Sequence, residues 1–264
     1  MSRTPHGIQV FSKTKLITLF CVLVTCNAAV NKVLAKSLLL LSDNAPPHMI
    51  AQQNAGIDID ITRDVLSALG HQTEIKFTPL TRSMVEVAQH RADLFLPTFF
   101  QSDTDELYFS DAIINYRPTV FSLAEDNFSF ENIAALRNKN IITFQGATGY
   151  FGEVFKDVAA NSPYRELPDM SKFPTLLLAK RSDVVVLDYY IFYYFLRQTA
   201  KSDSEYRALV SQINSHDLIP QVNAHVGFND QKLRDDFNQA LREYKAQNKH
   251  QYVIQKYIGE IIEN

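Results

Sequence analysis

The sequence predicts an α/β fold made of two lobes that are joined by two crossing strands. Short apolar runs alternate with segments of helical period, which is typical of an α/β fold with a largely parallel sheet. Two further apolar stretches interrupt this alternation and are interpreted as crossings between the lobes. Two amphipathic helices then close the chain. From this arrangement we expect a cleft between the lobes.

The N-terminal segment is predicted to be a secretory signal and not part of the fold. A polar, basic start leads into the apolar stretch 16–24 (LITLFCVLV), and residues 33–35 (VLA) fit the positions that signal peptidase reads. The apolar stretch is too short for a membrane span, which needs ~20 residues. We therefore expect residues 1–35 to be cleaved and a mature protein that begins at Lys36, free in the periplasm. A lipoprotein is the alternative, because Cys26 follows residues 23–25 (LVT), which resemble a lipoprotein signal.

The mature chain is expected to be acidic and free of cysteine. Cleavage removes Cys21 and Cys26, so stability must come from a packed core. The remaining 229 residues suffice for one large or two ordinary domains. They carry 22 Lys and Arg against 29 Asp and Glu, a formal charge of −7, which disfavours nucleic acid and anionic membranes as partners. No metal-ligand spacing or cofactor loop is apparent, so we expect no cofactor.

Short apolar runs are predicted as strands: residues 37–41 (SLLLL), 73–77 (TEIKF), 93–96 (DLFL), 140–143 (NIIT) and 183–187 (DVVVL). Apolar spacing indicates two helices between them, one with Val65, Leu66 and Leu69 that is closed by Gly70, and one with Met84, Val85 and Ala88. Residues 56–61 (GIDIDI) are ambiguous, because they alternate like a strand while Ile57, Ile61 and Val65 keep helical spacing. We interpret them as the approach to a helix.

Residues 118–123 (PTVFSL) and 221–228 (QVNAHVGF) are predicted to be the crossings. The chain leaves the first lobe at the former and returns at the latter. This assigns residues 36–118 and 224–264 to lobe 1 and residues 119–223 to lobe 2. After the return, residues 232–246 and 252–261 carry apolar side chains at helical spacing and are predicted as the two final helices.

A family resemblance rests on six segments that follow one another in order: residues 46–47 (PP) with 56–60 (GIDID), 79–82 (PLTR) with 90–93 (HRAD), 109–111 (FSD), 145–149 (QGATG), 183–188 (DVVVLD) and 233–241 (LRDDFNQAL). Together they cover essentially the whole mature chain. They resemble the periplasmic solute-binding proteins of the polar amino-acid type, family 3 of the bacterial extracellular solute-binding proteins. This resemblance implies the two-lobed type II periplasmic binding protein fold, which ionotropic glutamate-receptor ligand-binding domains share.

The function that the resemblance implies is binding without chemistry. We expect a monomeric protein that closes its lobes on a small polar solute by hinge motion and hands it to a transporter or a sensor. One alternative is an enzyme, because the resemblance includes periplasmic dehydratases related to prephenate and arogenate processing. Such chemistry needs a general acid in the cleft, for which Asp188 or Glu153 would be candidates. The other alternative is a ligand-free interaction module that kept the fold and lost the site.

The resemblance breaks at the position that grips a ligand carboxylate. Family members that bind α-amino acids resemble one another in a T-x-x-R sequence before the F-S segment, where Arg holds the carboxylate in a bidentate manner. This chain has no Arg or Lys between Arg91 and Arg117, and the slot holds Asp103 or Asp105. We therefore expect a ligand other than a standard amino acid held by its carboxylate, and favour a cationic or uncharged polar solute.

Residues 98–111 (TFFQSDTDELYFSD) form an acidic strip without a base. A metal loop, a solvated turn and a cleft wall that selects against anions are the three interpretations. Asp103 and Asp105 have the first spacing of a calcium loop, but no Gly follows at the turn and Ile114 stands at the twelfth position. A metal site is therefore disfavoured, and the other two interpretations stay open.

Two candidate contacts come from the second lobe. Gly146, Ala147 and Thr148 connect a predicted strand to a helical stretch, so backbone N–H groups and the Thr148 hydroxyl are available to an anion. The resemblance implies that this loop binds the ligand carboxylate; alternatively, its glycines only permit a tight turn.

Asp188 ends an apolar strand and faces the crevice where open α/β sheets bind ligands. The family uses an acid there for the ligand ammonium, and an N-cap of the following helix is the alternative. The run 189–195 (YYIFYYF) is interpreted as packing.

The first lobe supplies the other candidates. His48 falls where the family tends to place an aromatic ring over the ligand, or it is an ordinary surface histidine. Arg82 could replace the missing cation, although Glu86 offers it an i,i+4 pair. Thr98 and Phe99, just past a strand end, are better placed. The predicted ligand-binding residues are His48, Arg82, Thr98, Phe99, Gly146, Ala147, Thr148 and Asp188.

Overall fold

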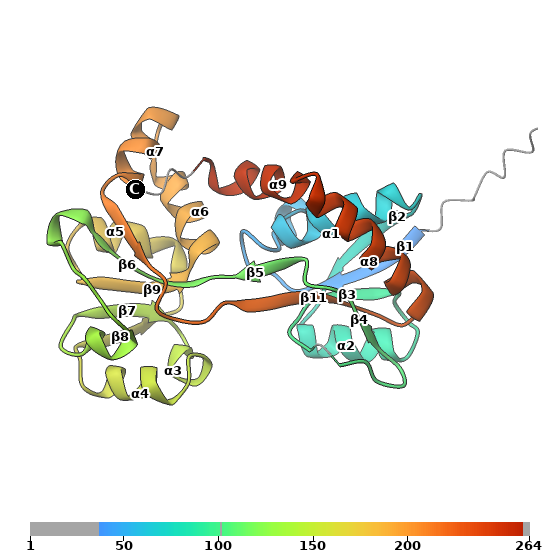
Figure 1. Cartoon of the computed structure of the whole chain (residues 1–264), viewed down its shortest axis with the longest axis horizontal. Coiled ribbons are helices and arrows are strands. Elements are labelled where there is room, and N and C mark those ends of the chain that lie inside the picture. Colours follow the sequence, from blue (N-terminus) through green and yellow to red (C-terminus); the bar gives the residue numbers. More distant parts are fainter. Residues whose placement is uncertain (1–36, 101, 261–264) are drawn as a thin grey trace, which may run out of the picture. The chain divides into compact units, whose positions relative to one another are not determined.

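The computed structural model describes residues 37–100 and 102–260. The predicted leader with its cleavage site, the alternative lipid site at Cys26 and the end of the last predicted helix lie outside these residues. Within them the strands form two mixed sheets that are covered by helices, so the chain folds as two α/β lobes, as predicted (Figure 1). In this part of the chain, every helix is too short or too polar to cross a bilayer.

The first sheet has the strand order β2-β1-β3-β11-β4, and β5 pairs with β11. Its strands are β1 (Ser37–Ser42), β2 (Gln72–Phe77), β3 (Leu94–Thr98), β4 (Tyr108–Phe109), β5 (Ile114–Tyr116) and β11 (Val222–Phe228). Its helices are η1 (Ala51–Gln53), α1 (Ile57–Ala68), α2 (Leu80–Ala88), α8 (Gln231–Ala246) and α9 (Lys249–Ile258). β1 pairs in parallel with β2 and β3, whereas β11 is antiparallel to β3.

The first sheet is covered on both faces because the side chains of β1 are apolar on both. Leu38 and Leu40 pack in one core cluster with Val65 of α1, and Leu41 packs in another with Val87 of α2. Figure 1 shows α1 and α8 on one side of this sheet and α2 on the other. A strand buried on both faces reads as a continuous apolar run and not as an alternation, which explains the sequence LLLL.

The second sheet has the strand order β10-β6-β9-β7-β8. Its strands are β6 (Pro118–Leu123), β7 (Ile141–Phe144), β8 (Tyr164–Leu167), β9 (Val184–Asp188) and β10 (Ile213–His216). Its helices are η2 (Ala124–Asp126), η3 (Ile133–Leu136), α3 (Ala147–Tyr150), α4 (Glu153–Ala160), η4 (Met170–Lys172), α5 (Phe173–Leu178), α6 (Tyr189–Thr199) and α7 (Asp203–Val210). β7 is parallel to both β8 and β9, so the loops after β7 and β9 lie at the same edge of this sheet.

One crossing lies earlier in the chain than the sequence predicts. All six residues of β6 are buried, and this strand belongs to the second sheet, between β9 and β10. The segment that pairs with β11 before the chain enters the second lobe is β5, in the register Tyr116↔Val222. β6 is apolar because it is an interior strand of the second sheet. The residue ranges assigned to the two lobes remain a proposal.

The ambiguous stretch 56–61 opens helix α1, and the two predicted C-terminal helices are α8 and α9. α9 packs against α1 and also against α6. Tyr189, Tyr190, Phe192 and Tyr193 of the aromatic run are buried in the core. That run is therefore packing, as predicted.

Candidate functional site

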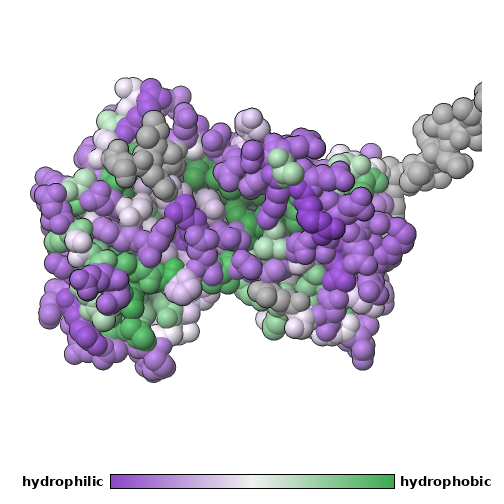
Figure 2. Space-filling model, viewed as in Figure 1, coloured by the Kyte–Doolittle hydropathy of each residue, from purple (hydrophilic) through white to green (hydrophobic). Residues whose placement is uncertain are grey.

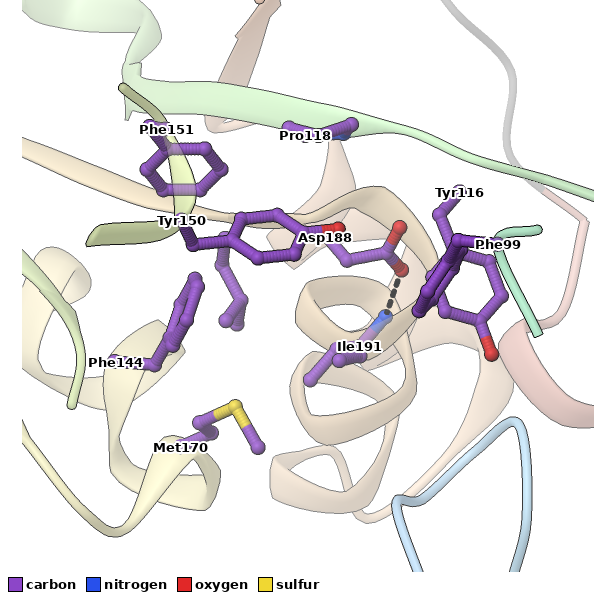
Figure 3. Close-up of a pocket in the computed structure, with 10 residues that line it drawn as sticks. Phe99, Tyr116, Pro118, Phe144, Tyr150, Phe151, Met170, Asp188 and Ile191 are labelled. Atoms are coloured by element: carbon purple, nitrogen blue, oxygen red, sulfur yellow. Dashed lines mark hydrogen bonds between the residues drawn. The ribbon is translucent and has the colours of Figure 1, made fainter. Parts of the chain in front are cut away.

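A pocket of about 240 Å³ lies beside Asp188 at the carboxyl end of β9. Its lining comes from the end of β3, from β5 and β6, and from the strand ends and helices of the second sheet (Figure 3). The lining residues are Phe99, Tyr116, Pro118, Phe144, Tyr150, Phe151, Met170, Leu187, Asp188 and Ile191. The pocket is smaller than those that hold drug-sized molecules, ~300–1,000 Å³. It suits a small solute.

Asp188 accepts hydrogen bonds from three backbone N–H groups, two at the start of α6 and one just before β6. Its Oδ1 accepts hydrogen bonds from the backbone N–H groups of Tyr190 at 2.9 Å and Ile191 at 3.2 Å, so it caps α6. Figure 3 marks the second of these bonds. Its Oδ2 accepts one from the backbone N–H of Arg117 at 2.8 Å. The cap reading of Asp188 is therefore confirmed, and its contact with a ligand stays a prediction.

His48 is not a surface histidine, because only 1% of it is exposed. Its Nδ1 lies 2.8 Å from Asp58 Oδ1 and its Nε2 lies 3.3 Å from Asp188 Oδ1. Its ring lies against that of Tyr116, with the centroids 4.0 Å apart. Burial lowers the pKa of His48, but the Asp58 and Asp188 carboxylates outweigh it and raise that pKa to about 10. His48 is thus a buried imidazolium that joins a carboxylate of α1 to the carboxylate at the pocket.

The buried cluster beside the pocket contains two acids and one imidazolium. Asp58 is fully buried on α1 and also accepts a hydrogen bond from the Tyr116 hydroxyl at 2.7 Å. Two carboxylates, Asp58 and Asp188, thus face one imidazolium. Asp188 is the one charged side chain among the described residues that line the pocket, and none of these is Lys or Arg. The described lining therefore offers no basic side chain to a ligand anion.

Aromatic rings make up most of the remaining wall. Phe144, Tyr150 and Phe151 meet edge to face, with centroids 5.2 to 5.8 Å apart. Phe99 meets Tyr116 edge to face at 5.7 Å. Burial and the Asp188 carboxylate raise the pKa of the Tyr150 hydroxyl, which stays a neutral phenol at physiological pH.

The turn before α3 holds a carboxylate of the protein itself. Gly146 has a φ of 89°, which glycine adopts without strain. The Gly146 N–H donates to Glu166 Oε2 at 2.8 Å, and the Thr148 N–H and hydroxyl both lie 3.3 Å from Glu166 Oε1. The Tyr164 hydroxyl donates to the same oxygen at 2.7 Å, and these donors, Tyr164 foremost, lower the pKa of Glu166. The Gly146 and Thr148 donors that the sequence offers to an external anion are thus engaged by Glu166 from β8.

The remaining predicted contacts separate into those at the pocket and those away from it. Phe99 lines the pocket, and Thr98 is buried just before it, with its Oγ1 accepting from the Phe100 N–H at 3.3 Å. Arg82 is exposed and pairs with Glu86 at 3.5 Å, and it does not reach the pocket lining. The lining also lacks Gly146, Ala147 and Thr148. These residues precede Tyr150 and Phe151 in the sequence.

The acidic side chains of the strip belong to a turn that is fastened to α8, whereas Phe99 at its start lines the pocket. Asp103 Oδ1 accepts from the Phe109 N–H at 2.8 Å and from Arg234 Nη1 at 2.9 Å. Asp111 pairs with Arg242 of the same helix at 2.9 Å. The described residues contain no group of His, Cys, Asp and Glu that could hold a metal ion. Asp103 pairs with Arg234 of α8 and is not among the described residues that line the pocket, so an effect of Asp103 on a ligand carboxylate stays a prediction.

A comparison with models of protein families identifies the family of this chain. The model of the bacterial extracellular solute-binding proteins, family 3, matches residues 39–260. The chain belongs to this family. The family is one of solute-binding proteins, whose function is binding without catalysis, so the dehydratase-like alternative is set aside. No curated protein matches the sequence.

Solved structures share the family 3 fold with this chain. An ancestral cationic amino acid solute-binding protein has a TM-score of 0.65 at 15% identity, over 84% of this chain and 95% of its own. The unliganded, open L-cystine solute receptor of Neisseria gonorrhoeae has a TM-score of 0.64 at 16% identity, over 87% and 95%. A histidine kinase sensor domain with similarity to periplasmic binding proteins has a TM-score of 0.57 at 15% identity, over 87% and 99%. At these identities the likeness establishes the type II fold and not the ligand.

Sequence reasoning missed several residues that this family 3 site depends on. Tyr116, Phe144, Tyr150 and Phe151 line the pocket, and Asp58 pairs with His48. A signal for Tyr150 and Phe151 was present, because they directly follow the Gly-rich turn at a strand end. The sequence gives no signal for Asp58, because an acid that alternates with apolar residues in GIDIDI is expected to be solvated. It gives no signal for Glu166 either.

Proposed function

We propose that this family 3 protein closes its two lobes on a small polar solute and delivers it to a transporter or a sensor. The observation that carries the proposal is the pocket at Asp188, which is lined by Phe99 from the end of β3 and by residues of the second sheet. β5 and β11 connect the two sheets next to it. Paired strands that join two lobes can absorb a hinge rotation.

The solute is proposed not to be a standard α-amino acid held by its carboxylate. No Lys or Arg stands among the described lining residues, whereas Asp188 does. The turn that the family resemblance assigns to the carboxylate is occupied by Glu166. A carboxylate that entered the pocket would lose water without gaining a charged partner, which costs several kcal/mol unless it is compensated. The ligand-contact roles of His48, Thr98, Phe99 and Asp188 belong to this proposal.

The location is part of the same proposal. Cleavage after Ala35 would release the mature chain into the periplasm as a monomer. Intact-mass analysis of secreted protein tests this, because the mature mass should correspond to a start at Lys36. A diacylated species that begins at Cys26 would contradict it, and size-exclusion chromatography with light scattering checks the monomer.

Thermal shift against a solute library tests the binding function. A compound that binds only the folded protein raises the melting temperature with its concentration. We expect stabilisation by one class of compound, and loss of that effect in Asp188→Asn, which keeps a side-chain oxygen for the helix cap. If no compound of the library changed the melting temperature of the folded protein, the ligand-free module would be favoured over the solute-binding protein.

A further inference from the structure

We propose that the solute is a small alkylated ammonium cation without a carboxylate, bound with its charge at Asp188 and its alkyl groups against five aromatic rings. This inference rests on the proposed solute-binding function and names the chemical class of the ligand. The faces of aromatic rings carry negative charge density and attract cations, most strongly where water is excluded.

The rings lie on two sides of the carboxylate. Phe144, Tyr150 and Phe151 form an edge-to-face trio from the second lobe, and Phe99 with Tyr116 forms a pair opposite. Figure 3 shows the Asp188 carboxylate between Tyr150 and the pair Phe99 and Tyr116. Met170 and Ile191 complete the apolar wall. A box of rings around one anion matches the way proteins bind quaternary ammonium groups.

The carboxylate retains capacity for a cation although His48 is near. The His48 imidazolium lies closer to Asp58, at 2.8 Å, than to Asp188, at 3.3 Å. Three donors contact Asp188 Oδ1, whereas Oδ2 accepts the Arg117 N–H. Oδ2 accepts fewer hydrogen bonds than Oδ1, so it is the oxygen against which a further positive group can lie. The cluster of Asp58, Asp188 and His48⁺ is left one negative charge in excess, which a monovalent cation balances.

The scarcity of acceptors favours an alkylated ammonium over a primary one. A primary ammonium brings three N–H donors into the pocket, and each needs an acceptor when it leaves water. The side-chain oxygens of the lining belong to Asp188, Tyr150 and Tyr116, and the Tyr116 hydroxyl is engaged with Asp58. Methyl groups need no acceptor and instead pack against rings. A cavity of about 240 Å³ limits the cation to a small one.

Calorimetric titration of the mature protein with matched probes tests the inference. Choline and tetramethylammonium are compared with 3,3-dimethylbutan-1-ol, which has the shape of choline without its charge, with ethanolamine, and with glycine betaine, which adds a carboxylate. We expect choline to bind at least about tenfold more tightly than the neutral alcohol and than ethanolamine. Glycine betaine should bind at least about tenfold more weakly than choline, because its carboxylate meets an acidic site.

Two variants and a control assign the binding to the pocket. Asp188→Asn should weaken choline binding by about tenfold or more, and Tyr150→Leu, at a half-exposed ring whose loss leaves the core intact, should also weaken it. Tyr252→Leu, an exposed tyrosine of α9 outside the pocket, should leave binding unchanged. Equal binding of choline and the alcohol, no binding of either ammonium ion at millimolar concentration, or unchanged binding in Tyr150→Leu overturns the inference. If another solute of the library then binds and depends on Asp188, the solute-binding function stands and only the ligand class is wrong.

Discussion

The Glu166 carboxylate accepts a hydrogen bond from the Gly146 N–H at 2.8 Å. The protein thereby places its own acid on the turn where the family resemblance locates a ligand carboxylate. No described residue that lines the pocket is Lys or Arg. These two observations support the proposal that the solute is not held by an α-carboxylate.

Removing Glu166 should make carboxylates better ligands. In Glu166→Ala the donors of Gly146 and Thr148 are released, so we expect saturable binding of glutamine in a calorimetric titration, which wild type should lack. Glu153→Ala removes the same charge from an exposed site of α4 and is the control. Equal affinities in the two variants would show that the turn does not face the ligand.

The buried His48 should make stability depend on alkaline pH. Its folded pKa of about 10 lies above its ordinary 6.5. A raised pKa means that the ion pair stabilises the fold fully below pH 6.5 and loses this contribution as the pH rises through about 10. Urea unfolding of wild type should therefore show a fall in unfolding free energy on the order of a few kcal/mol across this window, and His48→Gln should lack it. A titration of the His48 ring by NMR near pH 6.5 would contradict the assignment.

The acidic strip should matter for stability and not for binding. Asp103→Ala removes the contacts with the Phe109 N–H and with Arg234, and should lower the free energy of unfolding by about 1–2 kcal/mol. Asp105, exposed on the same turn, should change it by less than about 0.5 kcal/mol when replaced by Ala. Urea denaturation measures both. A ligand affinity that changes in Asp103→Ala but not in Asp105→Ala would restore the cleft-wall interpretation.

Gly56 should be required for the position of His48. Its φ is 147°, and a Cβ there would lie 2.2 Å from the His48 carbonyl oxygen. Gly56→Ala should therefore destabilise the protein by about 1–3 kcal/mol and weaken ligand binding. Gly149→Ala, where a Cβ meets no atom within 4 Å, should change stability by less than about 1 kcal/mol. Thermal unfolding of the two variants side by side decides this.

The parts of the fold that the sequence predicts are those with local signals. The runs that became β1, β3, β7 and β9 are apolar because both of their faces are buried. Asp188 was predictable for a related reason, since an acid at the end of such a run and before a helix has few roles open to it. β8 was missed, because the residues of this edge strand are only partly buried.

The parts that were not predicted depend on pairs far apart in the chain. Glu166 reaches the Gly146 turn only because β7 and β8 pair in the register Thr143↔Glu166. Asp103 meets Arg234 across a separation of 131 residues. In both cases the local sequence reads as a solvated acid. The partner is fixed by strand register or helix docking, which single residues do not reveal.

Calorimetric titration of the mature protein with the twenty standard amino acids tests the central claim most directly. The account predicts no saturable binding of glutamate or glutamine, while the ammonium probes bind. Micromolar binding of glutamate or glutamine to wild type would contradict it, and Arg82→Ala would then show whether Arg82 leaves its pair with Glu86 to hold the carboxylate.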